Sequence, residues 1–314
     1  MDEVERAVSV VVNDCLGVAD GEDALVICNP ATRGLGETLR DEAERAGADA
    51  VLAVMAERAS HAAEPPPTLV AAMAKADVVL APTVQSLSHT AARKAASEAG
   101  ARIGTLPGVT EDILARVMSA DMGELRRRGN ALAEALDAAS EARITCANGS
   151  DLRLGLEGRE AIPDAGELTA AGAFGNIPCG EGFIAPTGGE GQLVIDGSIA
   201  AVGIPDEPVT LTVENDRLTD ATGKAGAELM QLLTPHGPEA TTVAELGIGT
   251  NEKATLTGNV IEDEKILGTA HVAFGASKAI GGTVQVPVHL DCVVMKPDVT
   301  LDGEQIVRAG ELLV

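Results

Sequence analysis

Two histidines and one aspartate in the last third of the sequence have the types and the spacing of metal ligands. His271 lies in GTAHVAFG, and His289 and Asp291 lie in VPVHLDCVV. Residues i and i+2 of a β-strand project to the same face, so the alternating apolar frame predicts that His289 and Asp291 point the same way. Two imidazoles and a carboxylate directed at one point form the ligand set of a divalent metal. The alternative is a buried histidine that is simply hydrogen-bonded to an aspartate.

Two glutamates extend this candidate site. Glu181 stands between two glycines in GNIPCGEGFIAP, where a solvated turn is the alternative, and Glu245 follows an apolar strand start in VAELGIGTN. Glycine beside a polar residue lets backbone and substrate approach closely. A buried carboxylate needs a partner, which a metal ion or a histidine supplies. The acidic run EDEK at 262–265 is typical of a solvated helix start. The predicted ligands are Glu181, Glu245, His271, His289 and Asp291.

These ligands are compatible with two chemistries. Carboxylates and histidines together suffice for two metal ions that share a bridging carboxylate, generate a bound hydroxide and polarise the carbonyl of an amide. His271, His289 and Asp291 alone form the facial triad of a non-haem Fe(II) oxygenase.

Composition excludes several classes of partner. The formal net charge of −25 argues against binding to nucleic acid or to anionic membrane surfaces, and no apolar run approaches membrane-spanning length. The start MDEVERAVSV lacks the basic and apolar regions of a signal peptide, so we expect a cytoplasmic protein. Five scattered cysteines without a CxxC pair are typical of reduced thiols.

Aromatic residues are scarce, and their positions are informative. The chain has no tryptophan, no tyrosine and three phenylalanines, two of which lie within three residues of predicted ligands. Rings kept in these segments indicate the wall of a substrate pocket, with chance clustering as the alternative. The predicted pocket residues are Phe174, Phe183 and Phe274.

The pattern of apolar runs predicts two domains. Short apolar strands alternate with helical segments in the first third, which indicates an α/β domain with a doubly wound parallel sheet at 1–140. From 141 onward strands are separated by turn signals such as Asn148–Gly149, which predicts an α+β, antiparallel-strand-rich metal-binding domain at 141–314. The predicted strands are 24–28, 50–54, 77–82 and 101–104. The predicted helices are 34–46, 67–75, 88–98, 110–118, 121–140, 223–234 and 251–254.

The segments GNIPCGEGFIAP, AELGIGTN, GTAHVAFG and HLD, in this order, resemble the thermophilic metalloaminopeptidase family that includes aminopeptidases T and S. The resemblance covers the second domain and, more loosely, the first. It implies that Glu181, His271, His289 and Asp291 are metal ligands and that Glu245 is a ligand, a bridging carboxylate or the general base. It also suggests Glu264 as a ligand, although the local spacing differs.

Two departures place the chain in a divergent branch of that family. The peptidases have a catalytic tyrosine, and this chain has none. The interval from His271 to His289 is also shorter than in the peptidases. The divergent branch is similar to 2,5-dihydroxypyridine 5,6-dioxygenase, a mononuclear Fe(II) ring-cleaving enzyme.

Our leading interpretation of the sequence is an aminopeptidase-like metallohydrolase that removes N-terminal residues from short peptides with two Zn, Co or Mn ions. The alternative is a dioxygenase with one Fe(II) that cleaves a hydroxylated heteroaromatic, and a second alternative is a non-catalytic metal-binding relic. Glycine-rich segments around Glu181, Gly188–Gly189 and Gly281–Gly282 predict an open site. An open site, together with the family resemblance, leads us to expect a homo-oligomer, specifically a dimer.

Overall fold

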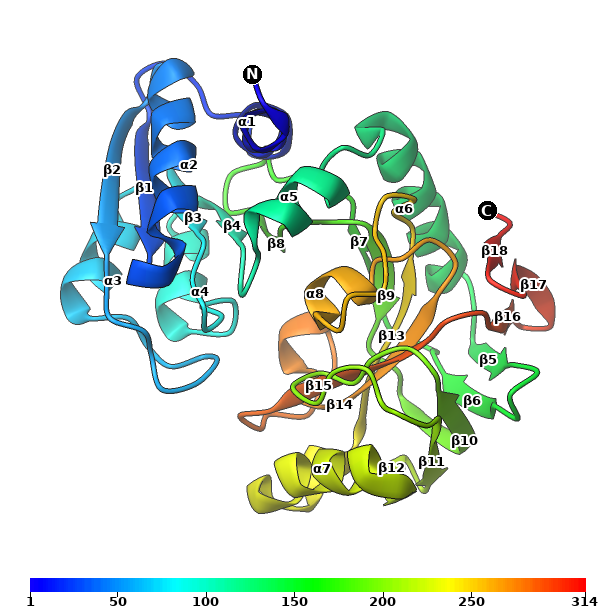
Figure 1. The fold of residues 1–314 in the computed structure, drawn as a ribbon. Coiled ribbons are helices and arrows are strands. Elements are labelled where there is room, and N and C mark those ends of the chain that lie inside the picture. The colour runs from blue at the N-terminus through cyan, green and yellow to red at the C-terminus, as the bar shows by residue number, and fades with distance from the viewer. The chain divides into compact units, whose positions relative to one another are not determined.

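The computed structural model describes residues 1–314 and divides them into two compact units (Figure 1). Met1–Met122 and Gly166–Cys179 form the first unit, and Gly123–Ala165 and Gly180–Val314 form the second. This division differs from the expected single boundary at residue 140. Helix α6 (Met122–Asp137) belongs almost wholly to the second unit, because its Leu132 and Leu136 are part of that unit's apolar core.

The first unit has the predicted doubly wound α/β organisation, with a five-stranded, all-parallel sheet in the order β2-β1-β3-β4-β8. The strands are β1 (Asp23–Cys28), β2 (Asp49–Val54), β3 (Val78–Ala81), β4 (Arg102–Thr105) and β8 (Phe174–Asn176). Strand β3 is buried along its whole length, as an interior parallel strand must be. Strand β8 returns from beyond residue 140 to pair with β4, which no local sequence pattern indicates.

Four of the five helices of the first unit follow the predicted segments within a few residues, and α1 is additional to them. The five helices are α1 (Glu3–Ser9), which continues as a π-helical turn (Val10–Cys15), α2 (Arg33–Arg45), α3 (Pro67–Met73), α4 (Ala91–Glu98) and α5 (Glu111–Val117). The side chains of Thr90 and Thr110 cap α4 and α5 by accepting hydrogen bonds from backbone amides of the first turn. No helix in either unit has both the length and the apolar character needed to cross a membrane.

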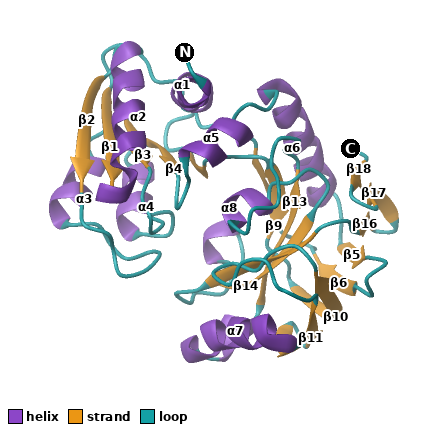
Figure 2. Cartoon of the chain, viewed as in Figure 1, coloured by secondary structure: helices purple, strands orange, loops and turns teal.

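The second unit contains two sheets, drawn as orange strands in Figure 2. The eight-stranded sheet has the order β12-β11-β10-β6-β5-β16-β17-β18, and the five-stranded sheet has the order β15-β14-β13-β9-β7. The strands of the larger sheet are β5 (Glu141–Thr145), β6 (Asp151–Gly155), β10 (Gly188–Ile195), β11 (Val209–Glu214), β12 (Arg217–Ala221), β16 (Asp298–Leu301), β17 (Glu304–Arg308) and β18 (Glu311–Leu312). Strands β5 and β6 form the hairpin predicted through Asn148–Gly149.

The five-stranded sheet is antiparallel throughout and carries the candidate site. Its strands are β7 (Ala161–Asp164), β9 (Glu181–Ile184), β13 (Val243–Gly249), β14 (Ala270–Gly275) and β15 (His289–Val294). Helix α7 (Gly223–Leu233) confirms the predicted helix at 223–234. The helix predicted at 251–254 is wrong: Asn251 accepts a hydrogen bond from the amide of Lys253 in a turn, and the short helix is α8 (Val260–Asp263).

Side chains from both sheets of the second unit and from α6 and α7 meet in one apolar core. On the five-stranded sheet the core residues alternate along each strand, for example Leu246 and Ile248 on β13 and Leu290 and Cys292 on β15. The residues between them project to the opposite face because the side-chain period of a strand is two. Cys292 therefore has the packing role expected from the sequence, and the opposite face is left for polar groups.

Candidate metal site

One face of the five-stranded sheet brings together all five predicted ligands. Glu181 comes from β9, Glu245 from β13, His271 from β14, and His289 and Asp291 from β15. The first three are buried, with Glu181 5%, Glu245 7% and His271 0% exposed. Asp291 is 9% exposed and the His289 side chain about 20%. The site is therefore mostly enclosed by its own unit, so the open site expected from the glycine-rich segments is wrong. Gly188 and Gly189 lie within β10 and pair with β6.

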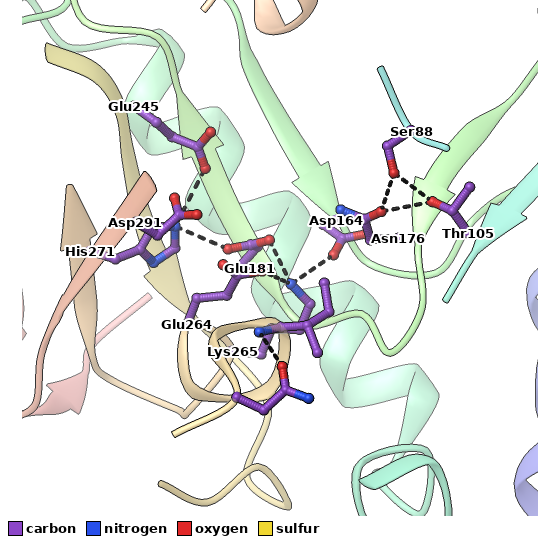
Figure 3. A network of polar contacts seen from close by, with 12 residues as sticks. Ser88, Thr105, Asp164, Asn176, Glu181, Glu245, Glu264, Lys265, His271 and Asp291 are labelled. Carbon is purple, nitrogen blue, oxygen red and sulfur yellow. Dashed lines mark hydrogen bonds and ion pairs between the residues drawn. The ribbon is translucent and has the colours of Figure 1, made fainter. Parts of the chain in front are cut away.

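The side chains of this face are close enough to act on one another, and Figure 3 shows His271 between Glu181 and Glu245. The His271 Nε2 atom lies 3.2 Å from Glu181 Oε2 and 3.4 Å from Glu245 Oε1. The His289 Nε2 atom lies 3.3 Å from Glu245 Oε2 and 3.3 Å from Asp291 Oδ1. Glu245 thus faces both imidazoles, one with each oxygen. The shared strand face of His289 and Asp291 confirms the prediction from the His-x-Asp spacing.

Gly247 provides the space that the His271 ring occupies. It pairs with His271 on β14 and with Phe183 on β9. A Cβ atom at Gly247 would lie 3.0 Å from His271 Cδ2 and nearer still to Nε2 and Cε1. The imidazole therefore lies directly over the backbone of β13, and only glycine leaves room for it there.

A backbone carbonyl orients the His289 ring through the nitrogen that faces away from the carboxylates. Its Nδ1 atom is 2.6 Å from the carbonyl oxygen of Ala276, which accepts its hydrogen bond. Such a bond fixes the tautomer and leaves Nε2 free to face the carboxylates. The arrangement is typical of a metal-ligating histidine.

Sequence reasoning missed Lys265 and Asp164. The interpretation of the run 262–265 as a solvated helix start is wrong, since Glu262, Asp263 and Lys265 are all 0% exposed. The Lys265 ammonium donates to Glu181 Oε1 at 2.8 Å and to Glu264 Oε1 at 2.7 Å, and Asp164 Oδ2 lies 3.6 Å away. The acidic neighbours in the sequence concealed this position, because a run of charges looks the same whether it is solvated or paired in the interior.

The segment before Lys265 is held by its own buried carboxylates. Asp263 accepts hydrogen bonds from the amides of Thr257 and Gly258, and Glu262 accepts one from the amide of Thr255. These bonds satisfy carboxylates that would otherwise be costly to bury. They also fix the backbone that presents Glu264 and Lys265 to the site.

The charges of the face shift the pKa values of its histidines. Burial by itself lowers the pKa of His271, but the hydrogen bond to Glu245 and the nearby Glu181 raise it to about 9. Burial also lowers the pKa of His289, and Asp291 and Glu245 outweigh this and hold it well above its usual value. For Glu245, burial acts to raise the pKa, but hydrogen bonds from His271 and His289 dominate and keep it below the usual value. The metal-free face is therefore a set of paired opposite charges.

The carboxylates around Lys265 have raised pKa values. Burial is the main cause for Glu264, whose pKa rises to about 8, and for Asp164, whose pKa rises to about 6. Burial likewise raises the pKa of Glu181. Lys265 stays charged, because the carboxylates of Glu181, Glu264 and Asp164 raise its pKa well above its usual value against the effect of burial.

The donor set fits a divalent metal ion. Three overlapping groups each have ligand atoms within 4.8 Å of one another, namely Glu181–Glu245–His271, Glu245–His289–Asp291 and Glu264–His271–Asp291. Two adjacent ligands of an ion held at about 2.1 Å lie roughly 3 Å apart, close to the separations of the histidine and carboxylate atoms. The His271 Nδ1 atom has no hydrogen-bond partner, so its ring is not committed elsewhere. Two imidazoles with carboxylates suit Fe(II) among other first-row metals.

The three phenylalanines do not form one pocket wall. The prediction of Phe274 as a pocket residue is wrong. Its side chain projects from β14 to the face opposite His271 and is 0% exposed within the apolar core. Phe183 is half-buried and shares the site face of β9 with Glu181. Phe174 lies on β8 in the first unit, where the guanidinium of Arg93 stacks 4.1 Å from the ring centre.

A separate polar cluster lies in the first unit and was also missed. Ser88 contacts Thr105 at 2.9 Å and donates to Asn176 at 3.0 Å, and Thr105 donates to Asn176 at 2.8 Å (Figure 3). Thr105 and Asn176 end the parallel strands β4 and β8, at the edge where open α/β sheets bind ligands. Both hydroxyls of the cluster therefore converge on the side-chain oxygen of Asn176.

With this geometry established, comparison with known proteins gives the family. The sequence model of the 2,5-dihydroxypyridine 5,6-dioxygenase family matches residues 20–314, nearly the whole chain. The chain belongs to this family. The 2,5-dihydroxypyridine 5,6-dioxygenase of Pseudomonas putida is 25% identical over 260 residues, which are 77% of this chain and 72% of that protein.

Solved structures show the same fold. A 2,5-dihydroxypyridine dioxygenase from Pseudomonas putida KT2440 matches with a TM-score of 0.88 at 20% identity, over 100% of this chain and 98% of that chain. The wild-type AmpT of Thermus thermophilus matches with a TM-score of 0.73 at 18% identity, over 99% of each chain. The fold class expected from the sequence is thereby confirmed, as is the link to a divergent branch of this scaffold.

The leading interpretation of the sequence, an aminopeptidase, is corrected by these findings. The family match and the curated relative both point to the dioxygenase, which the sequence offered as the alternative. The error has a physical origin. The dioxygenase and AmpT structures both have the fold of this chain, and a shared fold does not specify the reaction. The absence of tyrosine from the chain indicated the chemistry better than the ligand-bearing motifs did.

Proposed function

We propose that this protein is an Fe(II)-dependent dioxygenase that opens the ring of 2,5-dihydroxypyridine or of a closely related hydroxylated nitrogen heteroaromatic. The observation that carries the proposal is that Asp291 has a ligand atom within 4.8 Å of one of His271 in one group and of one of His289 in another, on one sheet face of a chain of this family. Two histidines and one carboxylate form the ligand set of non-haem Fe(II) oxygenases. In the overall reaction the bond between ring carbons 5 and 6 breaks, and both atoms of one O₂ enter the product.

The residues of the face would divide the work. His271, His289 and Asp291 would hold the metal, with His289 kept in position by its bond to the Ala276 carbonyl. Glu245 faces both imidazoles and would serve as a further ligand or accept the proton of a substrate hydroxyl. When bound, the ferrous ion supplies the one-electron chemistry that dioxygen needs to react with a closed-shell ring.

Two further side chains would shape the site. The Oε1 atom of Glu181 accepts from Lys265, whereas its Oε2 atom lies 3.2 Å from His271 Nε2 without a hydrogen-bond partner, so one oxygen is fixed and the other would be available to the metal. Phe183 stands on the same face of β9, two residues from Glu181, and offers an aromatic surface to a flat substrate. A small-molecule substrate would suit this enclosed, partly apolar face.

The test uses the full chain purified without oxygen and loaded with Fe(II). On mixing with 2,5-dihydroxypyridine and O₂, we expect one O₂ to be consumed for each ring opened. An oxygen electrode measures the O₂ uptake, and the absorbance of the substrate measures the loss of the ring. With ¹⁸O₂, mass spectrometry should find both labelled atoms in the product. His289→Ala should abolish the reaction, and the matched control His236→Ala, at an exposed histidine of a 3-10 helical turn, should not.

Two results would contradict the proposed reaction, and a third would contradict the proposed role of His289. Absence of O₂ uptake with this substrate and with related hydroxypyridines, in protein that holds its iron, would exclude ring cleavage. Product carrying one labelled oxygen or none would show a different oxidation chemistry. Undiminished turnover by His289→Ala would remove the metal-ligand role of that residue.

A further inference from the structure

Lys265 is the only cationic lysine or arginine side chain in contact with the carboxylates of the metal-binding face. It is the second residue after α8, and its side chain is 0% exposed. The ammonium lies 2.8 Å from Glu181 Oε1, 2.7 Å from Glu264 Oε1 and 3.6 Å from Asp164 Oδ2 (Figure 3). These three carboxylates come from β9, from the segment after α8 and from β7, so Lys265 links three separate parts of the unit.

A lysine in this position is costly unless it is fully compensated. Removing an ammonium from water is strongly unfavourable, and a fully buried lysine is found almost only where it is paired. Three carboxylates supply the compensation here. In return, the lysine binds carboxylate oxygens that a metal ion would otherwise bind.

The contacts of Glu181 show how this divides the site. Its Oε1 atom accepts from Lys265, and its Oε2 atom faces His271 at 3.2 Å. Glu264 also directs one oxygen to Lys265, while its carboxylate remains in reach of His271 and Asp291. One side of this carboxylate cluster therefore faces the histidines, and the other side faces the ammonium.

We propose that the Lys265 ammonium takes the place of a second metal ion, so that the face binds one divalent metal rather than two. The metal's identity rests on the proposed function, but the count rests on Lys265. Glu181, Glu264 and Asp164 would make a suitable oxygen-rich site for a second ion beside the first. The ammonium already lies among their oxygens and would repel a divalent cation at that distance.

The proposal defines Lys265 as a positioning residue. It holds Glu181 with Oε2 toward His271, and it withdraws one oxygen each of Glu181 and Glu264 from metal binding. A lysine with a merely structural role would affect stability without changing how many ions bind. The number of ions bound per chain is therefore the informative measurement.

The experiment titrates the metal-free full chain with Mn(II) and counts bound ions by inductively coupled plasma mass spectrometry. Electron paramagnetic resonance then distinguishes an isolated Mn(II) from two ions coupled at short distance. We expect one isolated ion per chain in the wild type and in the exposed-lysine control Lys224→Met. Lys265→Met removes the charge at similar length, and we expect it to bind a second, coupled ion.

A second variant keeps the proposal testable if Lys265→Met does not fold. Lys265→Met/Asp164→Asn removes one buried negative charge together with the positive one, and it keeps Glu181 and Glu264 for the second ion. Circular dichroism establishes which variants are folded before ions are counted. We expect two ions per chain in whichever of these two variants is folded.

Either of two results would overturn the proposal. The first is two ions per chain in the wild type, and the second is one ion per chain in a folded variant without Lys265. Neither depends on ring cleavage. One bound ion in a wild-type protein that consumes no O₂ would contradict the proposed function and would still support the role of Lys265.

Discussion

The substitution Gly247→Ala tests whether the space beside β13 decides metal binding. The new methyl group would lie 3.0 Å from His271 Cδ2 and nearer still to Nε2 and Cε1. Since carbon atoms pack at about 3.5 Å or more, the ring must move by at least about 0.5 Å. Metal–ligand distances tolerate changes of only about 0.2 Å. We expect the Kd for Fe(II) or Mn(II) to rise at least about 100-fold. This is the upper end of the losses seen when the orientation of a metal ligand is disturbed.

The assay separates loss of metal from loss of fold. Isothermal titration with Mn(II) gives the Kd, and thermal unfolding of the metal-free chain gives stability, where overpacking should cost about 1–3 kcal/mol. The matched control is Gly104→Ala, in the first unit and away from the metal site. Gly104 is a strand glycine, and a Cβ atom there would lie 3.2 Å from Ile177 and 3.3 Å from Leu16. It should lose comparable stability and bind the metal normally. Wild-type metal affinity in folded Gly247→Ala would refute the reasoning.

Three further predictions concern protons and charge. The pKa of His271 is raised from 6.5 to about 9 in the metal-free protein, so its contribution to stability is complete below pH 6.5 and is lost as the pH rises through 9. Metal binding needs the neutral ring, so the metal-induced rise in Tm should be larger at pH 9 than at pH 6.5, and a constant shift would contradict this. Glu245→Gln keeps the side-chain size but cannot accept a proton, so turnover should fall about 100-fold or more while metal content, measured in parallel, stays near wild type. With a net charge of −25, the Tm should rise with KCl concentration, and the expected dimer should strengthen in sedimentation runs over the same series; a monomer at every salt concentration would exclude it.

Local periodicity determined much of this protein's architecture. Alternating strand and helix patterns predicted the parallel sheet of the first unit, because strand and helix periods are properties of short segments. The period of two in VPVHLDCVV placed His289 and Asp291 on one face and Cys292 on the other, as the structure has them. Turn chemistry at Asn148–Gly149 predicted the β5–β6 hairpin for the same local reason.

The same reasoning could not separate the two chemistries of the scaffold. Both solved structures have the fold of this chain, so the strands that carry the ligand motifs do not distinguish one chemistry from the other. Ligand type and spacing specify that a metal binds, whereas the reaction depends on the number of ions and on the groups around them. Those groups come from segments distant in the sequence.

Tertiary structure alone decided which charged residues are buried and what they contact. Lys265 looked solvated among acidic neighbours, and its burial depends on Glu181 from β9 and Asp164 from β7, residues more than eighty positions away. Phe274 lies three positions from His271 on β14, and its side chain projects to the opposite face, into the apolar core. Gly247 matters only because β14 places His271 beside it. Periodicity fixes the direction of a side chain relative to its own strand, but the partner in that direction is chosen by long-range strand pairing.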